Sequence, residues 1–300
     1  QCFRVLRENA KFNFFNFVES IMADDGLLKS ALNLMRRMPP SSTETSLSGL
    51  INLLPDLTEE LLQRVDQPLK IDKDPISKRH FILCDYNRDG DSYRSPWSNK
   101  YTPAMSDGFV PSDKLRKLEI VANEIFDRYR KLYFEGGVSS VYFWDLDNGC
   151  FASCWLIHKD VEELRGINTG LWDSIHVFEV IDKHGGKFEY KLTTTVMISM
   201  NVRNKKLGLV DLSGSMTKQD TRTIKIDLDE KTHIGNMGKM IEEIELQVRQ
   251  AIEGIYIQKT REVINGMRSS DTAGKMFKNL VLDELHDKVK AHSSKRKEDG

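Results

Sequence analysis

A stretch in which apolar and polar residues alternate, between residues 138 and 216, constrains the fold of this chain more than any other feature. Successive side chains of a strand point to opposite faces, so a period of two predicts β-structure. The turns Asp147-Asn148-Gly149 and His184-Gly185-Gly186 interrupt the alternation, and Asn-Gly favours a tight hairpin. Consecutive hairpins predict a five-stranded antiparallel sheet within 136–232. The expected strands are 138–146, 151–157, 172–181, 188–200 and 207–216.

Before the sheet, apolar residues recur at helical spacing. Within 22–70 this spacing predicts three short helices, which end at Pro39-Pro40, at Pro55 and before Pro68. Short helices with tight breaks between them indicate an antiparallel helical stalk.

The region 71–135 is expected to be irregular at first and helical at its end. It is polar and rich in Asp, Asn, Ser, Tyr and Pro, with little periodicity up to residue 111. A fourth helix is expected to begin at Ser112 or Asp113, which are good helix-capping residues, and to end at Gly136-Gly137.

A further helical pattern follows the sheet and covers 233–269. A helix of this length would be roughly 50 Å long, enough to lie across a sheet or to cross a subunit interface. The predicted fold class is therefore α+β. It consists of an N-terminal antiparallel helical stalk, a five-stranded antiparallel sheet, a long covering helix and a C-terminal amphipathic helix.

The last segment, 270–300, carries a narrow apolar stripe and a charged tail. On a helical wheel, Phe277, Val281, Leu285 and Val289 align, with Leu282 at the edge of the stripe. Such a helix either packs on the core of its own chain or lies in the groove of a partner. The pattern alone leaves both interpretations open.

Composition limits the classes of function. The formal net charge of −1 over 300 residues argues against a general nucleic-acid binder, because such proteins carry a basic excess. Four cysteines without metal-ligand spacing predict neither a zinc site nor a disulfide scaffold. Residues 1–21 are interpreted as a leader or a non-native extension, because Met22 opens a cleaner polar start.

The arrangement of residues does not favour catalysis. The segment 85–91 matches the first half of an EF-hand loop, but Pro96 stands where a bidentate Glu belongs. A turn-rich loop is therefore the simpler interpretation. On the predicted strands, Cys150, Cys154 and His176 are expected to be structural. We expect no metal site, no cofactor and no enzymatic activity.

Several uncommon sequence segments occur in order along the chain. They are LMRRMPP at 34–40, VDQPL at 65–69, CDYNRD at 84–89, DSYRSPWSNKY at 91–101, LRKLE at 115–119, EGGVSSVY at 135–142 and WDSIHV at 172–177. Together they resemble the β-subunit family of the heterodimeric actin-filament capping protein, over residues 22 to about 269. In that family the α and β subunits share a fold, and their sheets join edge to edge.

This resemblance implies a function and a set of contact residues. With an α subunit as obligate partner, the chain would bind the fast-growing (barbed) ends of actin filaments and block subunit exchange, without severing and independently of calcium. Lys239 and Arg249 would contact actin, although Gln247 stands where the family has a companion basic residue. The C-terminal residues Phe277, Val281, Leu282, Leu285 and Val289 would dock on the filament.

An alternative function is that of a regulatory scaffold. By the same resemblance, the stalk side binds peptides that carry capping-protein-interaction motifs. The implied contact residues are Arg37, Asp66, Asp85, Arg88 and Tyr101. These residues could instead cap helices and hold loops. Acidic phosphoinositides are a further expected partner, nucleic acid is not, and the expected location is the cytoplasm, at the cytoskeleton.

Overall fold

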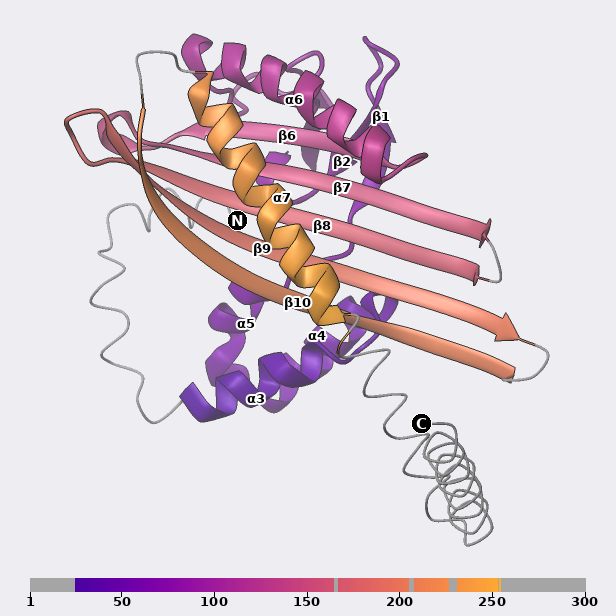
Figure 1. Cartoon of the computed structure of the whole chain (residues 1–300). Helices are drawn as coiled ribbons and strands as arrows, with labels where there is room; N and C mark the ends of the chain where they lie inside the picture. Colours follow the sequence, from indigo (N-terminus) through magenta and orange to yellow (C-terminus); the bar gives the residue numbers. More distant parts are fainter. Residues whose placement is uncertain (1–24, 165–166, 205–207, 227–230, 253, 255–300) are drawn as a thin grey trace, which may run out of the picture. The chain divides into compact units, whose positions relative to one another are not determined.

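The computed structural model describes residues 25–164, 167–204, 208–226, 231–252 and 254 (Figure 1). Contacts divide the chain into two units between Leu246 and Gln247, within the last described helix. The first unit holds the sheet and the other described elements. Among the described helices, none combines the length and the apolar character needed to cross a membrane.

A five-stranded antiparallel sheet forms the centre of the first unit, as predicted. Its strands lie in the order β10-β9-β8-β7-β6. They are β6 Val138–Asp145, β7 Phe151–Leu164, β8 Ile167–Asp182, β9 Lys187–Asn204 and β10 Gly208–Lys225. Four strands, β7 to β10, run further than the alternation predicts. The extension of β10 is an example, because its paired register with β9 continues to Lys225 through a polar stretch rich in threonine. Backbone pairing does not require apolar side chains.

The two predicted hairpin turns are confirmed. A short 3-10 helix over Asp147–Gly149 joins β6 to β7, and Gly149 has a φ of 75°, which glycine adopts without strain. His184, Gly185 and Gly186 also have positive φ angles and join β8 to β9. The positions of both hairpins were therefore predicted correctly from their turn residues, since positive φ angles in tight turns favour particular residue types.

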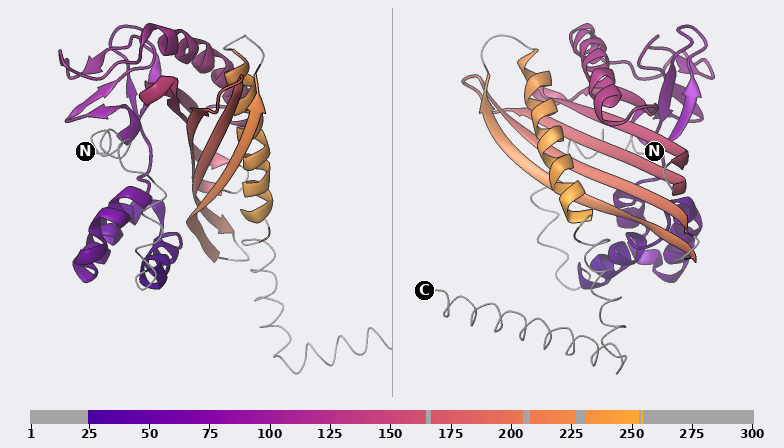
Figure 2. Two further views of the ribbon diagram at one scale, coloured as in Figure 1. Left: turned by 90° about the vertical axis from the view of Figure 1, so that its left-hand side faces the viewer. Right: turned by 45° about the vertical axis from the view of Figure 1, so that its right-hand side comes forward.

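Two long helices pack on one face of the sheet, α6 Asp113–Tyr133 and α7 Thr232–Ile252 (Figures 1 and 2). Ser112 caps α6 as predicted, because its Oγ accepts from the backbone of Leu115 at 3.5 Å. Asp145 at the end of β6 accepts two further bonds from Ser112, from the backbone N–H at 2.8 Å and from the hydroxyl at 2.7 Å. The part of the predicted long helix from 255 to 269 lies outside the described residues.

The opposite face of the sheet carries the polar middle region. This region forms two small sheets that the sequence pattern did not predict. Their strands are β1 Lys70–Lys73, β2 His80–Leu83, β3 Arg88–Asp89, β4 Ser92–Arg94 and β5 Tyr101–Thr102. Strands of two to four residues are too short to show an alternation, and all four residues of β1 are exposed. Ile82 and Leu69 join the apolar cluster on this face, together with Tyr142, Trp144 and Cys154 of the large sheet.

Three short helices occur where the N-terminal spacing predicts them. They are α3 Asp25–Met35, α4 Thr43–Leu53 and α5 Thr58–Arg64. They share an apolar cluster of their own, whose buried members are Leu28, Ala31, Met35, Leu47, Leu50, Leu57 and Leu61. The antiparallel stalk arrangement stays a prediction.

A buried polar contact fixes the segment after α5 to the sheet. Asp173 on β8 accepts from the backbone N–H of Leu69 at 2.9 Å and contacts Nδ1 of His158 at 2.6 Å. Nε2 of His158 lies 3.0 Å from Asp160. Burial lowers the pKa of His158, but the hydrogen bonds and negative charges of Asp173 and Asp160 outweigh burial and raise it above its ordinary value.

The raised pKa of His158 predicts a pH dependence of stability. A group with a higher pKa in the folded state binds its proton more tightly there, so the protonated form favours folding. This contribution is complete below the unfolded pKa of about 6.5 and is lost as the pH rises through the folded value. We therefore expect the difference in unfolding free energy between the native protein and a His158→Gln variant to shrink from acidic to alkaline pH. Urea unfolding over that range measures it, and a constant difference would contradict it.

Candidate functional site

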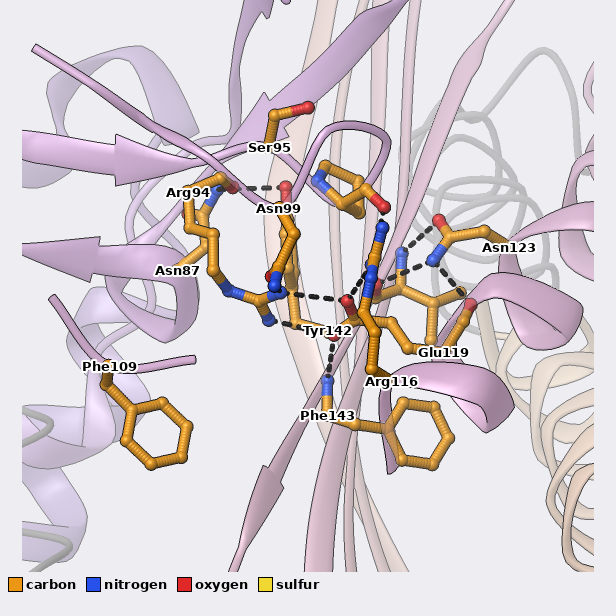
Figure 3. Close-up of polar contacts among 12 residues, drawn as sticks. Asn87, Arg94, Ser95, Asn99, Phe109, Arg116, Glu119, Asn123, Tyr142 and Phe143 are labelled. Carbon is orange, nitrogen blue, oxygen red and sulfur yellow. Dashed lines mark hydrogen bonds and ion pairs between the residues drawn. The ribbon is translucent and has the colours of Figure 1, made fainter. Parts of the chain in front are cut away.

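The two edges of the large sheet differ. At the centre of the β6 edge, side chains of α6 bond to outward backbone groups of Val141 and Phe143 (Figure 3). Asn123 accepts from the N–H of Val141 at 2.9 Å and donates to its carbonyl at 2.8 Å. Glu119 accepts from the N–H of Phe143 at 2.7 Å. Because these groups already have partners, the β6 edge is closed to a further strand.

Glu119 is also the centre of a buried ion pair. Arg94 on β4 donates to both of its carboxylate oxygens at 2.8 Å, and the two side chains are 3% and 0% exposed. Burial lowers the pKa of Arg94, but the negative charge of Glu119 outweighs burial and raises it. Arg116 also contacts Glu119, and it donates to the carbonyl of Pro96 at 2.7 Å. The network therefore joins the middle region to α6 and β6.

Asn87 organises the loop that matches half of an EF-hand. Its side-chain oxygen accepts from the N–H of Cys84 at 2.9 Å, and its amide donates to the carbonyl of Arg94 at 2.9 Å and to Tyr142 Oη at 2.8 Å. Within the described part of the chain, no three His, Cys, Asp or Glu residues gather as a metal site would require. The segment 85–91 contains a short 3-10 helix, Asp85–Asn87, followed by strand β3, and side-chain to backbone bonds of Asn87 hold it in place.

The opposite edge, β10, is occupied at Ser215 by the turn after α3 but has no neighbouring strand in the described part of the chain. The backbone N–H of Ser215 donates to the carbonyl of Arg36, in the turn after α3, at 3.0 Å, so it points away from β9. Alternate residues of an edge strand present their backbone groups to the same side, and the register with β9 is continuous. Gln219, Thr221 and Thr223 therefore present theirs to the open side.

The side chains of β10 are suited to a buried edge. Gln219, Thr221 and Thr223 are exposed and uncharged. On the α7 side, Arg222 is paired with Asp220 at 2.7 Å and with Glu243 of α7 at 2.7 Å. Native proteins protect free edges with proline, bulges or unpaired charges, and the described length of β10 has neither a proline nor an interrupted register. This edge can accept the strand of a partner.

The structure brings together two of the predicted regulatory residues. Asp66, after α5, lies near Asp85, and burial and then the charge of Asp85 raise the pKa of Asp66, although a hydrogen bond with Thr195 opposes the shift. Arg37 is exposed in the turn after α3. Arg88 and Tyr101 lie on the outer strands of the three-stranded sheet.

Arg88 and Tyr101 have local partners. Arg88 donates to the carbonyl of Gly90 at 2.8 Å, and its contact with Asp91 is 3.9 Å long. The hydroxyl of Tyr101 donates to the carbonyl of Phe109 at 2.7 Å, and burial raises its pKa. Tyr101 therefore has a structural role in addition to any role at the surface.

A small cleft lies beside Asp66, between the N-terminal helices and strands β9 and β10. Its volume is ≈ 30 Å³, room for one or two water molecules. The lining includes Leu32, Met35, Arg36, Arg64, Asp66, Thr195 and Thr217. The cleft is too small for a cofactor or a drug-sized ligand.

Of the predicted actin contacts, the structure describes the two on α7, Lys239 and Arg249. Lys239 is 73% exposed, and its Nζ lies 3.9 Å from Glu243. Arg249 is half-buried and Gln247 is exposed. The predicted C-terminal contacts Phe277, Val281, Leu282, Leu285 and Val289 lie outside the described residues.

Sequence reasoning missed the residues that close the β6 edge. Glu119 and Asn123 occupy the apolar stripe of α6, among Leu115, Leu118, Ala122 and Phe126, and both are buried. A polar residue in the apolar stripe of a helix was the available signal, since buried polar groups require partners.

Comparisons with known proteins agree on one family. The model of the F-actin capping protein beta subunit matches residues 28–264. The F-actin-capping protein subunit beta of Dictyostelium discoideum is 51% identical over 245 residues, which cover 81% of this chain and 89% of that protein. Its counterpart in Caenorhabditis elegans is 49% identical over 260 residues, which cover 86% and 95%.

Among solved structures, a homodimeric actin capping protein alpha subunit from Plasmodium berghei has the same fold. Its TM-score is 0.51 at 16% identity, over 83% of this chain and 98% of that chain. This likeness concerns the fold alone, whereas the sequence matches extend over most of the chain. The chain therefore belongs to the F-actin capping protein β-subunit family.

Proposed function

We propose that this chain is the β subunit of a heterodimer that caps actin filaments at their barbed ends. The observation that carries the proposal is the difference between the two sheet edges: β6 is closed by α6, whereas β10 offers backbone groups to a partner strand. Relatives with about half of their residues identical are named F-actin-capping protein subunit beta, which supports actin as the target.

The proposed partner is a capping protein α subunit, whose edge strand pairs with β10. The α subunit of Plasmodium berghei shares the fold and is described as a homodimer, which supports the association of two such subunits. Pairing would satisfy the backbone groups of Gln219, Thr221 and Thr223, which water solvates in the isolated chain. The isolated subunit is therefore expected to aggregate or to fold incompletely.

Capping requires no chemistry in this proposal. The heterodimer occupies the filament end and blocks the addition and loss of actin, without severing the filament and without calcium. Lys239 and Arg249 supply the electrostatic contact, and the apolar residues of the segment 270–300 supply the docking contact. Cytoplasmic location at the actin cytoskeleton follows from this activity.

Filament elongation tests the proposal. The full chain, co-expressed with an α subunit, should stop barbed-end growth from actin seeds at substoichiometric concentration. The result should be the same in the presence of calcium and in the presence of a calcium chelator.

A Leu285→Asp variant should dissociate from filament ends faster than the native heterodimer, with an unchanged melting temperature, because losses at a docked interface appear mainly in dissociation. Leu132→Asp is the matched control, since Leu132 is 79% exposed on α6. Unchanged elongation with the native heterodimer would contradict the proposal.

A regulatory scaffold is the second candidate. The observation that favours it is the proximity of two carboxylates, Asp66 and Asp85, from segments far apart in the sequence. A basic peptide would relieve the repulsion between them. Asp85→Ala should then weaken binding of a capping-protein-interaction peptide and leave capping nearly intact, whereas a loss of both activities would indicate a structural role.

A further inference from the structure

The turn after α3 takes up part of the outer edge of β10. The backbone N–H of Ser215 donates to the carbonyl of Arg36 at 3.0 Å. The short 3-10 helix Pro40–Ser42, which follows the turn, contacts both β9 and β10, and Figure 1 shows the N-terminal helices on the β10 side of the sheet. A strand that paired with β10 at this position would place its own carbonyl where that of Arg36 lies. The turn therefore divides the outer edge into two parts, 208–213 and 217–225.

The direction of the backbone groups along β10 follows from two printed bonds. Ile226, just beyond the strand, donates its N–H to the carbonyl of Gly186 at 2.8 Å, which lies in the turn that leads into β9. Ser215 donates to the other side, and the register with β9 is continuous between the two ends of β10. Even-numbered residues therefore face β9 and odd-numbered residues face outward, so the odd positions of 217–225 can bond to a partner strand.

The turn is held firmly in its place. The N–H of Met38 donates to the carbonyl of Met35 at 3.1 Å, and Met35 and Pro40 are buried on either side of the turn. Met38 and Pro40 line the small cleft together with Ser215 and Thr217 of β10. A strand that displaced the turn would exchange one backbone bond at Ser215 for another of the same kind. Displacement would also expose buried apolar surface, so it would be unfavourable.

We propose that the turn 36–38 is a stop that confines pairing with the α subunit to residues 217–225 of β10. This inference rests on the proposed function, in which β10 is the edge that pairs with the α subunit. The partner strand ends at the turn, beside the exposed side chains of Arg36 and Arg37. An acidic residue at that end of the partner strand would complement the two positive charges.

A stop at one end of the paired segment also fixes its register. A shift of one residue between two strands turns every side chain of the shifted strand to the opposite face of the sheet. The polar stretch 217–225 is rich in threonine and alone specifies the register weakly. The N-terminal turn, far from β10 in the sequence, therefore determines how the two subunits align.

Hydrogen exchange, resolved by mass spectrometry to single amides, tests the proposal on the full chain co-purified with an α subunit. The outward amides of Gln219, Thr221 and Thr223 should exchange about a hundredfold more slowly than those of Leu209 and Asp211, because only the first three have partners in the heterodimer. Leu209 and Asp211 point to the same side of β10 but lie beyond the turn. This measurement requires no variant.

Two proline substitutions provide a second measurement. Gln219→Pro should weaken association with the α subunit about a hundredfold, because it removes an N–H that the partner strand bonds. Ser215→Pro removes the bond to Arg36 and no bond to the partner, so its affinity should stay within about threefold of the native value. Dissociation of the co-expressed heterodimer on dilution measures both.

The possible outcomes separate the inference from the proposed function. Protection of Leu209 and Asp211 equal to that of Thr221 would overturn the stop and leave the pairing of β10 in place. Exchange at Gln219, Thr221 and Thr223 as fast as at Leu209 would overturn both. A loss of affinity for Ser215→Pro as large as that for Gln219→Pro, with an unchanged melting temperature, would show that the partner strand pairs at Ser215 and would overturn the stop.

Discussion

Replacing Glu119 with alanine should lower the free energy of unfolding by about 3–5 kcal/mol, because it leaves the charge of Arg94 buried without a carboxylate to balance it. Arg94 is 3% exposed, so water cannot replace the carboxylate. The substitution also removes the acceptor for the N–H of Phe143 at the β6 edge. Urea unfolding of the co-purified heterodimer measures the effect.

Glu124→Ala is the matched control for this experiment. Glu124 lies on the same helix and is exposed, so its removal should change stability by no more than about 0.5 kcal/mol. A loss for Glu119→Ala as small as that of Glu124→Ala would show that the ion pair does not hold the middle region.

Replacing Thr221 with proline should weaken association with the α subunit about a hundredfold, or on the order of 2–3 kcal/mol. Proline removes the backbone N–H that Thr221 presents to the open side of β10, and its ring clashes with an incoming strand. Proline is tolerated at the edge of a sheet but not in its interior, so β10 should still pair with β9 while pairing with the partner strand weakens. Dissociation of the co-expressed heterodimer on dilution, compared between the native and variant chains, reports the loss.

Thr221→Ala keeps the N–H and removes the same side chain, so it should bind the α subunit almost as well as the native chain. If Thr221→Pro bound with native affinity, the partner strand would not pair at this position. If Thr221→Ala lost as much affinity as Thr221→Pro, the side chain and not the backbone would make the contact.

The sequence predicts the sheet better than it predicts the ends of the strands. Asn148-Gly149 and Gly185-Gly186 define the hairpins because their conformations are specific to the residue type. The last residues of β10 follow no apolar alternation, so the pattern ends at 216 although the strand reaches Lys225. Their pairing with β9 depends on backbone bonds, which a hydropathy pattern does not report.

The site residues were harder to predict for a different reason. Lys239, Arg249, Asp66 and Asp85 are predicted as contact residues only through resemblance to a family, and their roles stay predictions. Glu119 and Asn123 bond to a strand that follows their helix in sequence, and such tertiary contacts have no local signature beyond a polar residue at an apolar position. The small sheets of the middle region depend on these same contacts, which is why that region was expected to be irregular.

The closed β6 edge limits how many subunits can assemble. A sheet with two open edges could add copies at both ends and grow into a fibre. Here, the large sheet offers one open edge within the described residues, so pairing through β10 uses that edge. If the partner is closed in the same way, the joined sheet ends on both sides in helices, and assembly stops at two subunits. A protein that terminates filaments would then carry in its own fold a device that terminates its own polymerisation.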